Sequence, residues 1–203
     1  MKISIIVPIY NVKTALLEVA LDSLAKQTLR KDEYEIVLVD DASSMAETVA
    51  CYRQFAKSQY NVVVVCHDEN KGLNEARRSG VSASSGDYVV FVDGDDILTR
   101  DAIESLRMEA HRSDADIVTA PFYRWNYTNN TYATIPITEE AYDGDYVTRL
   151  KLILSKQYSY TMCGRLFRKS LFEEDVFDIP LGLLHEDMVT SVRVLFKLSL
   201  IHI

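Results

Sequence analysis

The sequence contains few cysteines, and they are widely spaced. The 203 residues include three, at Cys51, Cys66 and Cys163. A disulfide framework requires several cysteines in a short chain, and a cysteine-rich zinc site requires pairs a few residues apart, so the sequence excludes both. We therefore expect a reducing, cytoplasmic environment.

Long apolar runs and a surplus of basic charge are also missing. No run reaches the roughly 20 apolar residues that span a bilayer, and Met1-Lys2 leads directly into strand-like sequence instead of a signal peptide. With 22 basic and 30 acidic residues, the net charge is −8, which disfavours binding to nucleic-acid phosphates. We expect neither a membrane span nor a nucleic-acid partner, and the sequons at Asn126 and Asn129 carry little weight in a cytoplasmic protein.

Apolar runs alternate with segments of helical spacing over the first 120 residues. The runs typical of buried strands are residues 3–9, 35–39, 62–66, 88–92 and 117–120. The helical patterns are residues 15–24, 73–83, 102–111 and a segment ending near Lys57, with residues 42–44 as its turn and N-cap. Strands that alternate with helices predict βαβ units in a mainly parallel sheet, which is an α/β fold.

The alternation stops after Pro121. Residues 123–145 are rich in Tyr, Thr and Asn without a sustained period, which predicts loops and short antiparallel strands. Helical patterns return at residues 147–154, 170–172 and 188–198. The last residues, 200–203, are mostly apolar, so we expect a chain that is truncated at its C-terminus.

Acidic or aromatic residues follow three of the predicted strands. Tyr10-Asn11 come after the first, Asp40-Asp41 end the second, and Asp93-Gly94-Asp95-Asp96 follow the fourth. The carboxyl ends of the strands in a doubly wound sheet share one edge, so these residues would line one crevice.

Each of these positions has a functional and a structural interpretation. Asp93 and Asp95 can turn toward one divalent cation, which would offset their mutual repulsion, although acidic turns after strands are common without a metal. Asp40 can accept a hydrogen bond from a nucleobase, or it can cap the following helix. Tyr10 can stack on a base or pack on the rim of the sheet.

Taken in order, several segments resemble the inverting family 2 glycosyltransferases of the GT-A fold. The segments are SIIVPIYN (4–11), residues 23–28, EIVLVDDAS (35–43), residues 69–72 with Ala76, Arg77 and Gly80, GDYVVFVDGDD (86–96), CGRLFRK (163–169) and HED (185–187). The resemblance implies a mainly parallel sheet flanked by helices, with a small antiparallel and helical portion on the acceptor side. Residues 1–120 would bind the nucleotide sugar, and residues 121–203 would form the acceptor side of the same catalytic domain.

The resemblance also implies a donor site. Its residues would be Pro8, Tyr10, Asn11, Asp40, Asn70, Arg77, Asp93, Gly94 and Asp95. Asp40 would accept a hydrogen bond from uracil, Asp93 would face the ribose or the metal, and Asp95 would be the firmest ligand of Mn²⁺ or Mg²⁺. Asp96 would cap the turn. For Arg77, an ion pair on the helix surface remains the alternative.

On the acceptor side, the resemblance implies that Asp187 is the general base. It would take the proton of the acceptor hydroxyl as that oxygen attacks the anomeric carbon from the face opposite the diphosphate, so the configuration would invert. Glu186 and His185 would bind the acceptor. Acidic residues are also favoured at any helix N-terminus, so a purely structural role for Glu186-Asp187 stays open.

Two further groups of residues have open interpretations. Arg165, Arg168 and Lys169 are interpreted as a solvated basic face, although a basic residue near the donor is frequent at position 165 in the resembled family. The aromatic residues Phe122, Tyr123, Trp125 and Tyr127 either stack on a sugar acceptor or pack at the rim.

The expected activity is metal-assisted transfer of a hexosyl or N-acetylhexosaminyl group, with a UDP-sugar as the expected donor. The acceptor would be a saccharide, a polyol phosphate or a lipid-linked molecule in cell-surface polysaccharide or glycoconjugate synthesis. Peripheral association with the inner face of the membrane, through a segment beyond this chain, is part of this expectation. The alternatives are an inactive nucleotide-sugar-binding module and a phosphatase in which the first Asp of Asp-x-Asp is the nucleophile. Residues 42–45 and Arg78 depart from the usual family pattern, which leaves loop detail open.

Overall fold

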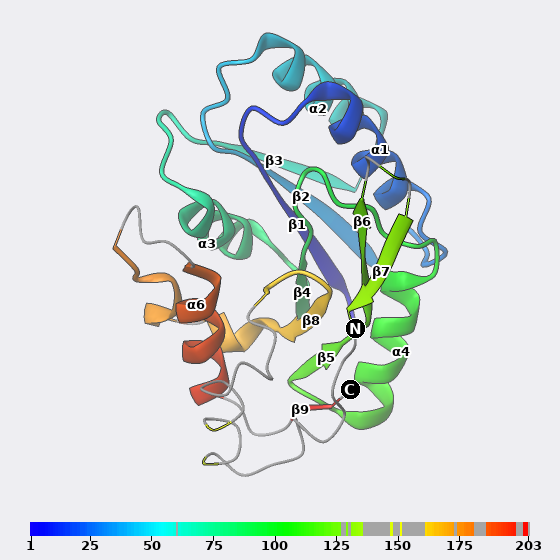
Figure 1. The fold of residues 1–203 in the computed structure, drawn as a ribbon, viewed down its shortest axis with the longest axis vertical. Coiled ribbons are helices and arrows are strands. Elements are labelled where there is room, and N and C mark those ends of the chain that lie inside the picture. The colour runs from blue at the N-terminus through cyan, green and yellow to red at the C-terminus, as the bar shows by residue number, and fades with distance from the viewer. Residues whose placement is uncertain are drawn as a thin grey trace.

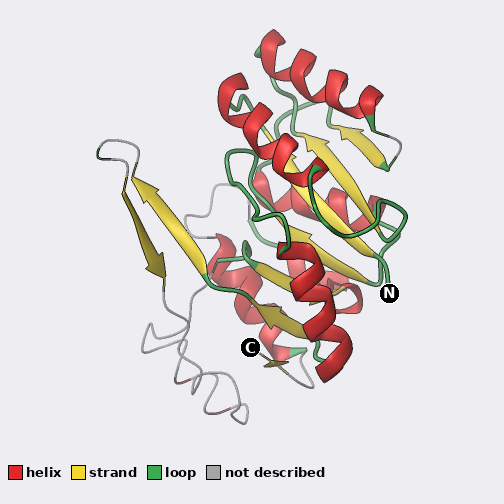
Figure 2. Ribbon diagram, turned by 90° about the vertical axis from the view of Figure 1, so that its right-hand side faces the viewer, coloured by secondary structure: helices red, strands yellow, loops and turns green. Residues whose placement is uncertain are grey.

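The computed structural model of this chain describes residues 1–59, 61–126, 129, 131–135, 147, 151, 161–172, 174–180, 186–197 and 201–202. Within them a central seven-stranded sheet has the strand order β3-β2-β1-β4-β8-β5-β9, and helices lie along it (Figure 1). A separate two-stranded sheet, β6-β7, stands apart from this body (Figure 2). None of the described helices is long and apolar enough to cross a membrane.

The first half of the sheet is parallel, as predicted. Its strands are β1 (Ile3–Ile9), β2 (Tyr34–Asp40), β3 (Val62–Cys66) and β4 (Tyr88–Phe91). Every residue of β1, β2 and β4 is buried, whereas β3, at the sheet edge, is partly exposed. The chain moves outward from β1 to β3 and then returns to place β4 on the other side of β1. This reversal creates a switch point at the carboxyl ends of β1 and β4, where open α/β sheets bind ligands.

The second half of the sheet is mixed, which the sequence analysis did not predict. β8 (Arg165–Arg168) pairs antiparallel with both β4 and β5 (Ile117–Thr119), and β9 (Ile201–His202) pairs parallel with β5. The interpretation of segment 165–169 as a solvated basic face is wrong for Arg165, which is 1% exposed. Only Leu166 and Phe167 in this strand are apolar, so its pattern was too short to stand out between basic residues.

Helices cover both faces of the sheet because side chains alternate along each strand. α1 (Thr14–Ala25), α2 (Ala46–Ser58) and α4 (Ala102–Ser113) pack on the face that β1 supplies with Ile3, Ile5, Val7 and Ile9. α3 (Leu73–Ala83), α6 (Glu186–Phe196) and the 3₁₀ helices η2 (Lys169–Phe172) and η3 (Glu174–Phe177) pack on the opposite face, around Ile6 and Phe91.

Close packing of α3 on β1 depends on a glycine. A Cβ atom at Gly80 would lie 2.3 Å from Cγ2 of Ile6, a separation that real structures do not tolerate. Gly80 therefore lets the C-terminal half of α3 lie close against β1 and β2.

The region after Pro121 agrees with its prediction where it is described. β6 (Phe122–Asn126) and β7 (Thr131–Ile135) form an antiparallel hairpin. The predicted helix at 147–154 lies almost entirely outside the described residues. The short pattern at 170–172 is part of a 3₁₀ helix, and the last helix spans Glu186–Phe196, so Glu186 and Asp187 lie in its first turn as predicted.

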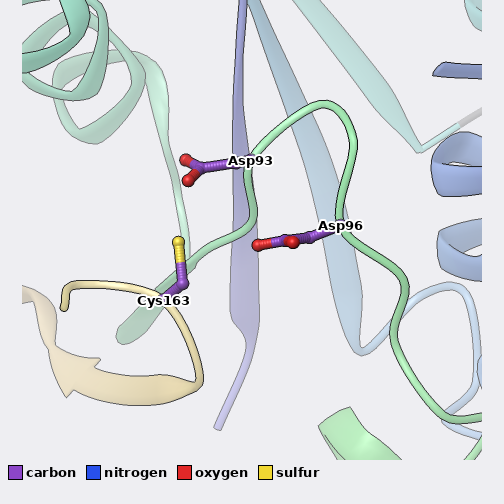
Figure 3. A group of neighbouring side chains, drawn as sticks. All are labelled: Asp93, Asp96 and Cys163. Atoms are coloured by element: carbon purple, nitrogen blue, oxygen red, sulfur yellow. The ribbon is translucent and has the colours of Figure 1, made fainter. Parts of the chain in front are cut away.

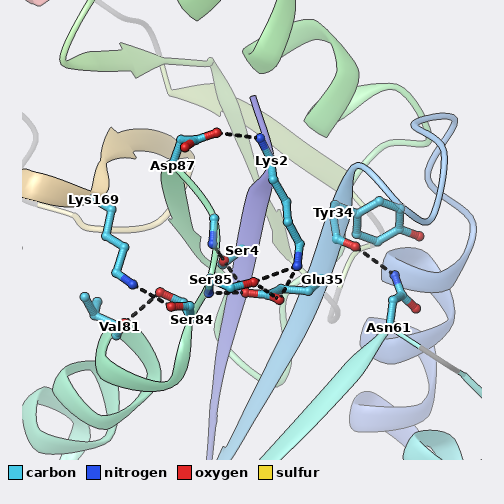
Figure 4. Close-up of polar contacts among 11 residues, drawn as sticks. Lys2, Ser4, Tyr34, Glu35, Asn61, Val81, Ser84, Ser85, Asp87 and Lys169 are labelled. Carbon is cyan, nitrogen blue, oxygen red and sulfur yellow. Dashed lines mark hydrogen bonds and ion pairs between the residues drawn. The ribbon is translucent and has the colours of Figure 1, made fainter.

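A buried carboxylate joins three segments at the amino ends of the strands, opposite the switch point (Figure 4). Glu35 is 6% exposed and accepts hydrogen bonds from Lys2 Nζ at 2.7 Å, Ser4 Oγ at 2.6 Å, and the Ser85 backbone N–H and hydroxyl. Burial alone would raise the pKa of Glu35, but these donors outweigh it and lower the pKa to about 2.

The lowered pKa predicts how stability depends on pH. Because the folded-state pKa of Glu35 lies below the ordinary value of 4.5, its contribution is fully present above pH 4.5 and is lost as pH falls toward 2. Glu35→Gln should lower the free energy of unfolding by about 2 kcal/mol at neutral pH, where charge-assisted hydrogen bonds are lost. Urea denaturation at several pH values measures this, and the gap between the two proteins should narrow below pH 4.5.

Glu18→Gln, on the exposed side of α1, is the matched control and should change stability by less than about 0.5 kcal/mol. If the difference in unfolding free energy between wild type and Glu35→Gln stays constant as the pH falls, the lowered pKa assigned to Glu35 is wrong.

Candidate active site

The loop after β1 presents an aromatic ring and fixes the start of α2. Tyr10 is 51% exposed, so its ring is available to a ligand. Asn11 has a positive φ of 49°, and its Oδ1 accepts hydrogen bonds from the backbone N–H groups of Ser44 at 2.8 Å and Met45 at 2.9 Å. Asn11 therefore satisfies donors at the N-terminus of α2 from a distant segment.

The structure corrects the predicted N-cap of α2. The N-cap residue of α2 is Met45, whose side chain makes no capping hydrogen bond, and not one of residues 42–44. Asn is one of the few residues that adopt a left-handed conformation at low cost, but the sequence did not show which helix its side chain would reach.

The acid pair at the end of β2 is buried and fully engaged. Asp40 is 6% exposed, and its two oxygens accept hydrogen bonds from the Ser43 N–H at 3.0 Å and the Tyr52 hydroxyl at 2.7 Å. Burial raises the pKa of Tyr52, and its hydrogen bond to Asp40 raises it further. Asp40 thus lies at the predicted edge, and its role toward uracil stays a prediction.

Asp41 organises the loop that leads into α3, which the sequence analysis did not foresee. Its carboxylate accepts hydrogen bonds from the backbone N–H groups of Lys71 and Gly72, both at 2.8 Å, and Nδ1 of His67 lies 2.6 Å away. Asn70, a predicted donor residue, lies in this loop and is exposed. The sequence places Asp41 directly after β2, but the residues that contact its carboxylate lie about 30 residues further along the chain.

The acidic turn after β4 brings two carboxylates and a thiol together (Figure 3). The ligand atoms of Asp93, Asp96 and Cys163 all lie within 4.8 Å of one another. Gly94 is buried, and a Cβ there would lie 3.1 Å from Val12 and 3.4 Å from the Pro8 carbonyl, so this turn packs closely on the end of β1. Among the described residues, Asp95 is exposed and does not belong to the group.

The acidic groups in this turn repel one another. Desolvation, and then the charges of Asp93 and Asp95, raise the pKa of Asp96 to about 6. Burial also raises the pKa of the Cys163 thiol, and the neighbouring carboxylates add to this effect. A cation placed among these groups would relieve the repulsion.

Arg77 is the buried centre of the site. It is 0% exposed, its Nη2 lies 3.4 Å from Asp93 Oδ1, and its Nη1 donates to Asp187 Oδ1. The guanidinium also lies 5.7 Å from the centroid of the Phe91 ring. Burial alone would lower the pKa of Arg77, but the Asp187 and Asp93 charges outweigh it and raise the pKa. The alternative of a helix-surface ion pair is wrong, and it is Arg78 that lies 3.5 Å from Glu75.

The first turn of α6 contains two acidic residues, Glu186 and Asp187. Asp187 is 29% exposed, and its Oδ2 accepts a hydrogen bond from the Met162 N–H at 3.4 Å. Burial raises the pKa of Glu186, and the charge of Asp187 adds to this effect. The hydroxyl of Thr190 donates to Asn74 Oδ1 at 3.0 Å, which ties α6 to α3. His185, predicted to bind the acceptor, lies outside the described residues.

The chemistry of the donor set fits a divalent metal. Two carboxylates that repel each other suit a divalent cation, because the cation offsets their charge. Mn²⁺ and Mg²⁺ both bind carboxylate and phosphate oxygens. Asp93 belongs both to the predicted pair and to the observed group, whereas Asp96 replaces Asp95 in that group. The prediction of Asp95 as a ligand is left open by this arrangement.

A doubly wound sheet with polar side chains gathered at its switch point is typical of α/β proteins that bind nucleotide ligands there. The model of the family "Glycosyl transferase family 2" matches residues 4–176. The chain therefore belongs to glycosyl transferase family 2.

Curated relatives agree with this assignment. The chain is 33% identical to glycosyltransferase GlyA of Streptococcus pneumoniae over 95% of its own length and 28% of that protein. It is 34% identical to the uncharacterized glycosyltransferase EpsJ of Bacillus subtilis over 84% of its length and 49% of that protein. The chain thus spans half or less of these relatives.

Solved structures confirm the predicted GT-A fold. TarS 1–349 of Staphylococcus aureus is similar with a TM-score of 0.76 at 24% identity, over 98% of this chain and 56% of that one. The mannosyltransferase PcManGT of Pyrobaculum calidifontis, solved with GDP-Man and Mn²⁺, is similar with a TM-score of 0.66 at 22% identity, over 95% of this chain and 51% of that one.

Proposed function

We propose that this chain is the donor-binding and catalytic part of an inverting glycosyltransferase, which transfers a sugar from a UDP-sugar to an acceptor hydroxyl. The observation that carries the proposal is the contact of one buried guanidinium, Arg77, with both Asp93 and Asp187. A carboxylate from the donor side and a carboxylate from the acceptor side thereby face one space, as a direct displacement requires.

The donor would bind along the carboxyl ends of β1, β2 and β4. The exposed ring of Tyr10 offers a stacking surface for the base, and Asn70 lies in the exposed loop before α3. The similar TarS structures include complexes with UDP and with UDP-GlcNAc, which supports a uridine nucleotide as the donor.

Asp93 and Asp96, with Asp95 as the ligand implied by the family resemblance, would hold Mn²⁺ or Mg²⁺. The metal would offset the negative charge that develops on the diphosphate as the sugar leaves. The Mn²⁺ named in the PcManGT complex supports a metal in this fold.

Asp187 would act as the general base. Arg77 and the Met162 N–H hold its carboxylate at the N-terminus of α6. The partial exposure of Asp187 leaves room for an acceptor hydroxyl. Asp187 would take the proton as the acceptor oxygen attacks the anomeric carbon from the side opposite the diphosphate. One displacement inverts the configuration.

The acceptor would be a saccharide, a polyol phosphate or a lipid-linked precursor of a cell-surface polymer. One relative, 39% identical over 51% of this chain, is the poly(ribitol-phosphate) beta-glucosyltransferase of Bacillus spizizenii. Tyr123, Trp125 and Tyr132 on one face of the β6-β7 hairpin are 59%, 48% and 73% exposed, and such rings can stack on sugars. A cytoplasmic location at the inner face of the membrane would suit such an acceptor.

A catalytically inactive module that binds nucleotide sugars is the alternative function. It requires the same donor site but no base, so the two differ in the role of Asp187. The phosphatase alternative has no support from the family assignment.

The proposed metal site predicts how UDP binds. UDP should bind this chain more tightly with Mn²⁺ than without it, and Asp93→Asn should reduce the Mn²⁺-dependent gain in affinity about tenfold or more, as for lost metal-site residues. Isothermal titration calorimetry with UDP measures this. Asp22→Asn, an exposed change on α1, is the control, and Asp95→Asn in the same titration tests the ligand that the resemblance implies. Metal-independent binding of UDP would count against the proposed site.

The proposed base predicts the effect of a change at Asp187. Asp187→Asn keeps an acceptor oxygen for Arg77 but cannot take a proton, so the rate of UDP-sugar hydrolysis or transfer should fall about 10²- to 10⁴-fold. UDP affinity should change little. A panel of UDP-sugars assayed for released UDP gives the rate, and calorimetry gives the affinity. An unchanged rate would remove Asp187 from the role of base, and a wild-type chain that binds UDP but never turns over would favour the binding module.

A further inference from the structure

Cys163 lies in the acidic group rather than in the apolar core. It comes from the segment before β8, and its side chain lies beside Asp93 and Asp96 from the turn after β4 (Figure 3). Cys51, by comparison, packs against the apolar core on the α1 face. A cysteine that served only to fill space would be expected in the second setting.

The backbone fixes where the Cys163 thiol lies. Cys163 forms an isolated parallel bridge with Phe91, the last residue of β4, and its N–H donates to the Thr161 hydroxyl at 3.2 Å. The next residue, Gly164, has a φ of +73°, which only glycine adopts freely. The thiol is therefore held at the carboxyl end of β4 by structure that exists without a ligand.

The three side chains form a mixed oxygen and sulfur ligand set. Zinc binds carboxylate oxygen at about 2.0–2.2 Å and thiolate sulfur at about 2.3 Å. Ligand atoms that already lie within 4.8 Å of one another need only small rotations to converge on one ion. Three protein ligands leave further positions open, as in catalytic zinc sites.

We propose that Cys163 is a ligand in this metal site and gives it affinity for thiolate-binding divalent ions such as Zn²⁺, Co²⁺ and Cd²⁺. Mn²⁺ and Mg²⁺ prefer oxygen ligands and leave the thiol protonated, whereas the softer ions bind sulfur. In the second case a metal–sulfur bond forms, the sulfur–hydrogen bond breaks, and the proton goes to solvent. If the proposed function holds, these ions compete with Mn²⁺ for the position that binds the diphosphate. This consequence rests on the proposed function, whereas metal binding by Cys163 does not.

Co²⁺ alone, titrated into the reduced chain, tests the inference. Co²⁺ bound to a thiolate gives an intense near-ultraviolet charge-transfer band, which carboxylate ligands do not give. The wild type should show this band with saturation, Cys163→Ser should lose it, and Cys66→Ser, which removes an exposed thiol at the end of β3, should keep it. The preference for Zn²⁺ over Mn²⁺ in competition should fall about tenfold in Cys163→Ser.

Absence of the band in the wild type, or its persistence in Cys163→Ser, would overturn the inference. If Cys163→Ser does not fold, Asp96→Asn provides a second test, because it should weaken Co²⁺ binding about tenfold while keeping the band at saturation. Co²⁺ binding unchanged in Asp96→Asn would also overturn it. If UDP binds with Mn²⁺ but Co²⁺ gives no charge-transfer band, this inference is refuted and the proposed function stands. If Co²⁺ gives the band but UDP does not bind with Mn²⁺, the proposed function alone is refuted.

Discussion

The buried charge of Arg77 is the constraint on which the rest of the site depends. A guanidinium removed from water is costly unless carboxylates and hydrogen bonds compensate it, and here the compensation comes from two different elements. Asp93 follows β4 and Asp187 lies in the first turn of α6, so the charge on α3 fixes both relative to each other. The Phe91 ring beneath the guanidinium adds a further favourable contact. One buried residue thus links the turn after β4 to the first turn of α6.

The sheet has polar networks at both ends and apolar packing between them. At the amino ends, Glu35 links β1, β2 and the turn before β4, while at the carboxyl ends Asp40, Asp41 and Asn11 fix the loops. In the first network, the carboxylate of Glu35 is fully hydrogen-bonded. The acidic turn at the carboxyl ends is not balanced, as the raised pKa of Asp96 indicates, and perturbed pKa values of this kind are common at functional sites.

Much of the fold follows from local pattern, because β1, β2 and β4 are nearly continuous runs of β-branched and aromatic residues separated by helical spacing. The strand β8 was missed because two basic residues enclose its short apolar pair. Arg77 and Asp187 were identified through family motifs, but their mutual contact spans more than a hundred residues and no local signal contains it. The same holds for the approach of Cys163 to Asp93 and for Asn11 at the start of α2, since each depends on how distant segments pack.

The coupling between Arg77 and Asp187 tests the central claim most directly. Free energies of unfolding for the wild type, Arg77→Met, Asp187→Ala and the double variant give a double-mutant cycle. The account predicts a coupling energy of about 1.5 kcal/mol or more, since each single change leaves a buried or half-buried charge without its partner. Effects of the two substitutions that add within about 0.5 kcal/mol would contradict it.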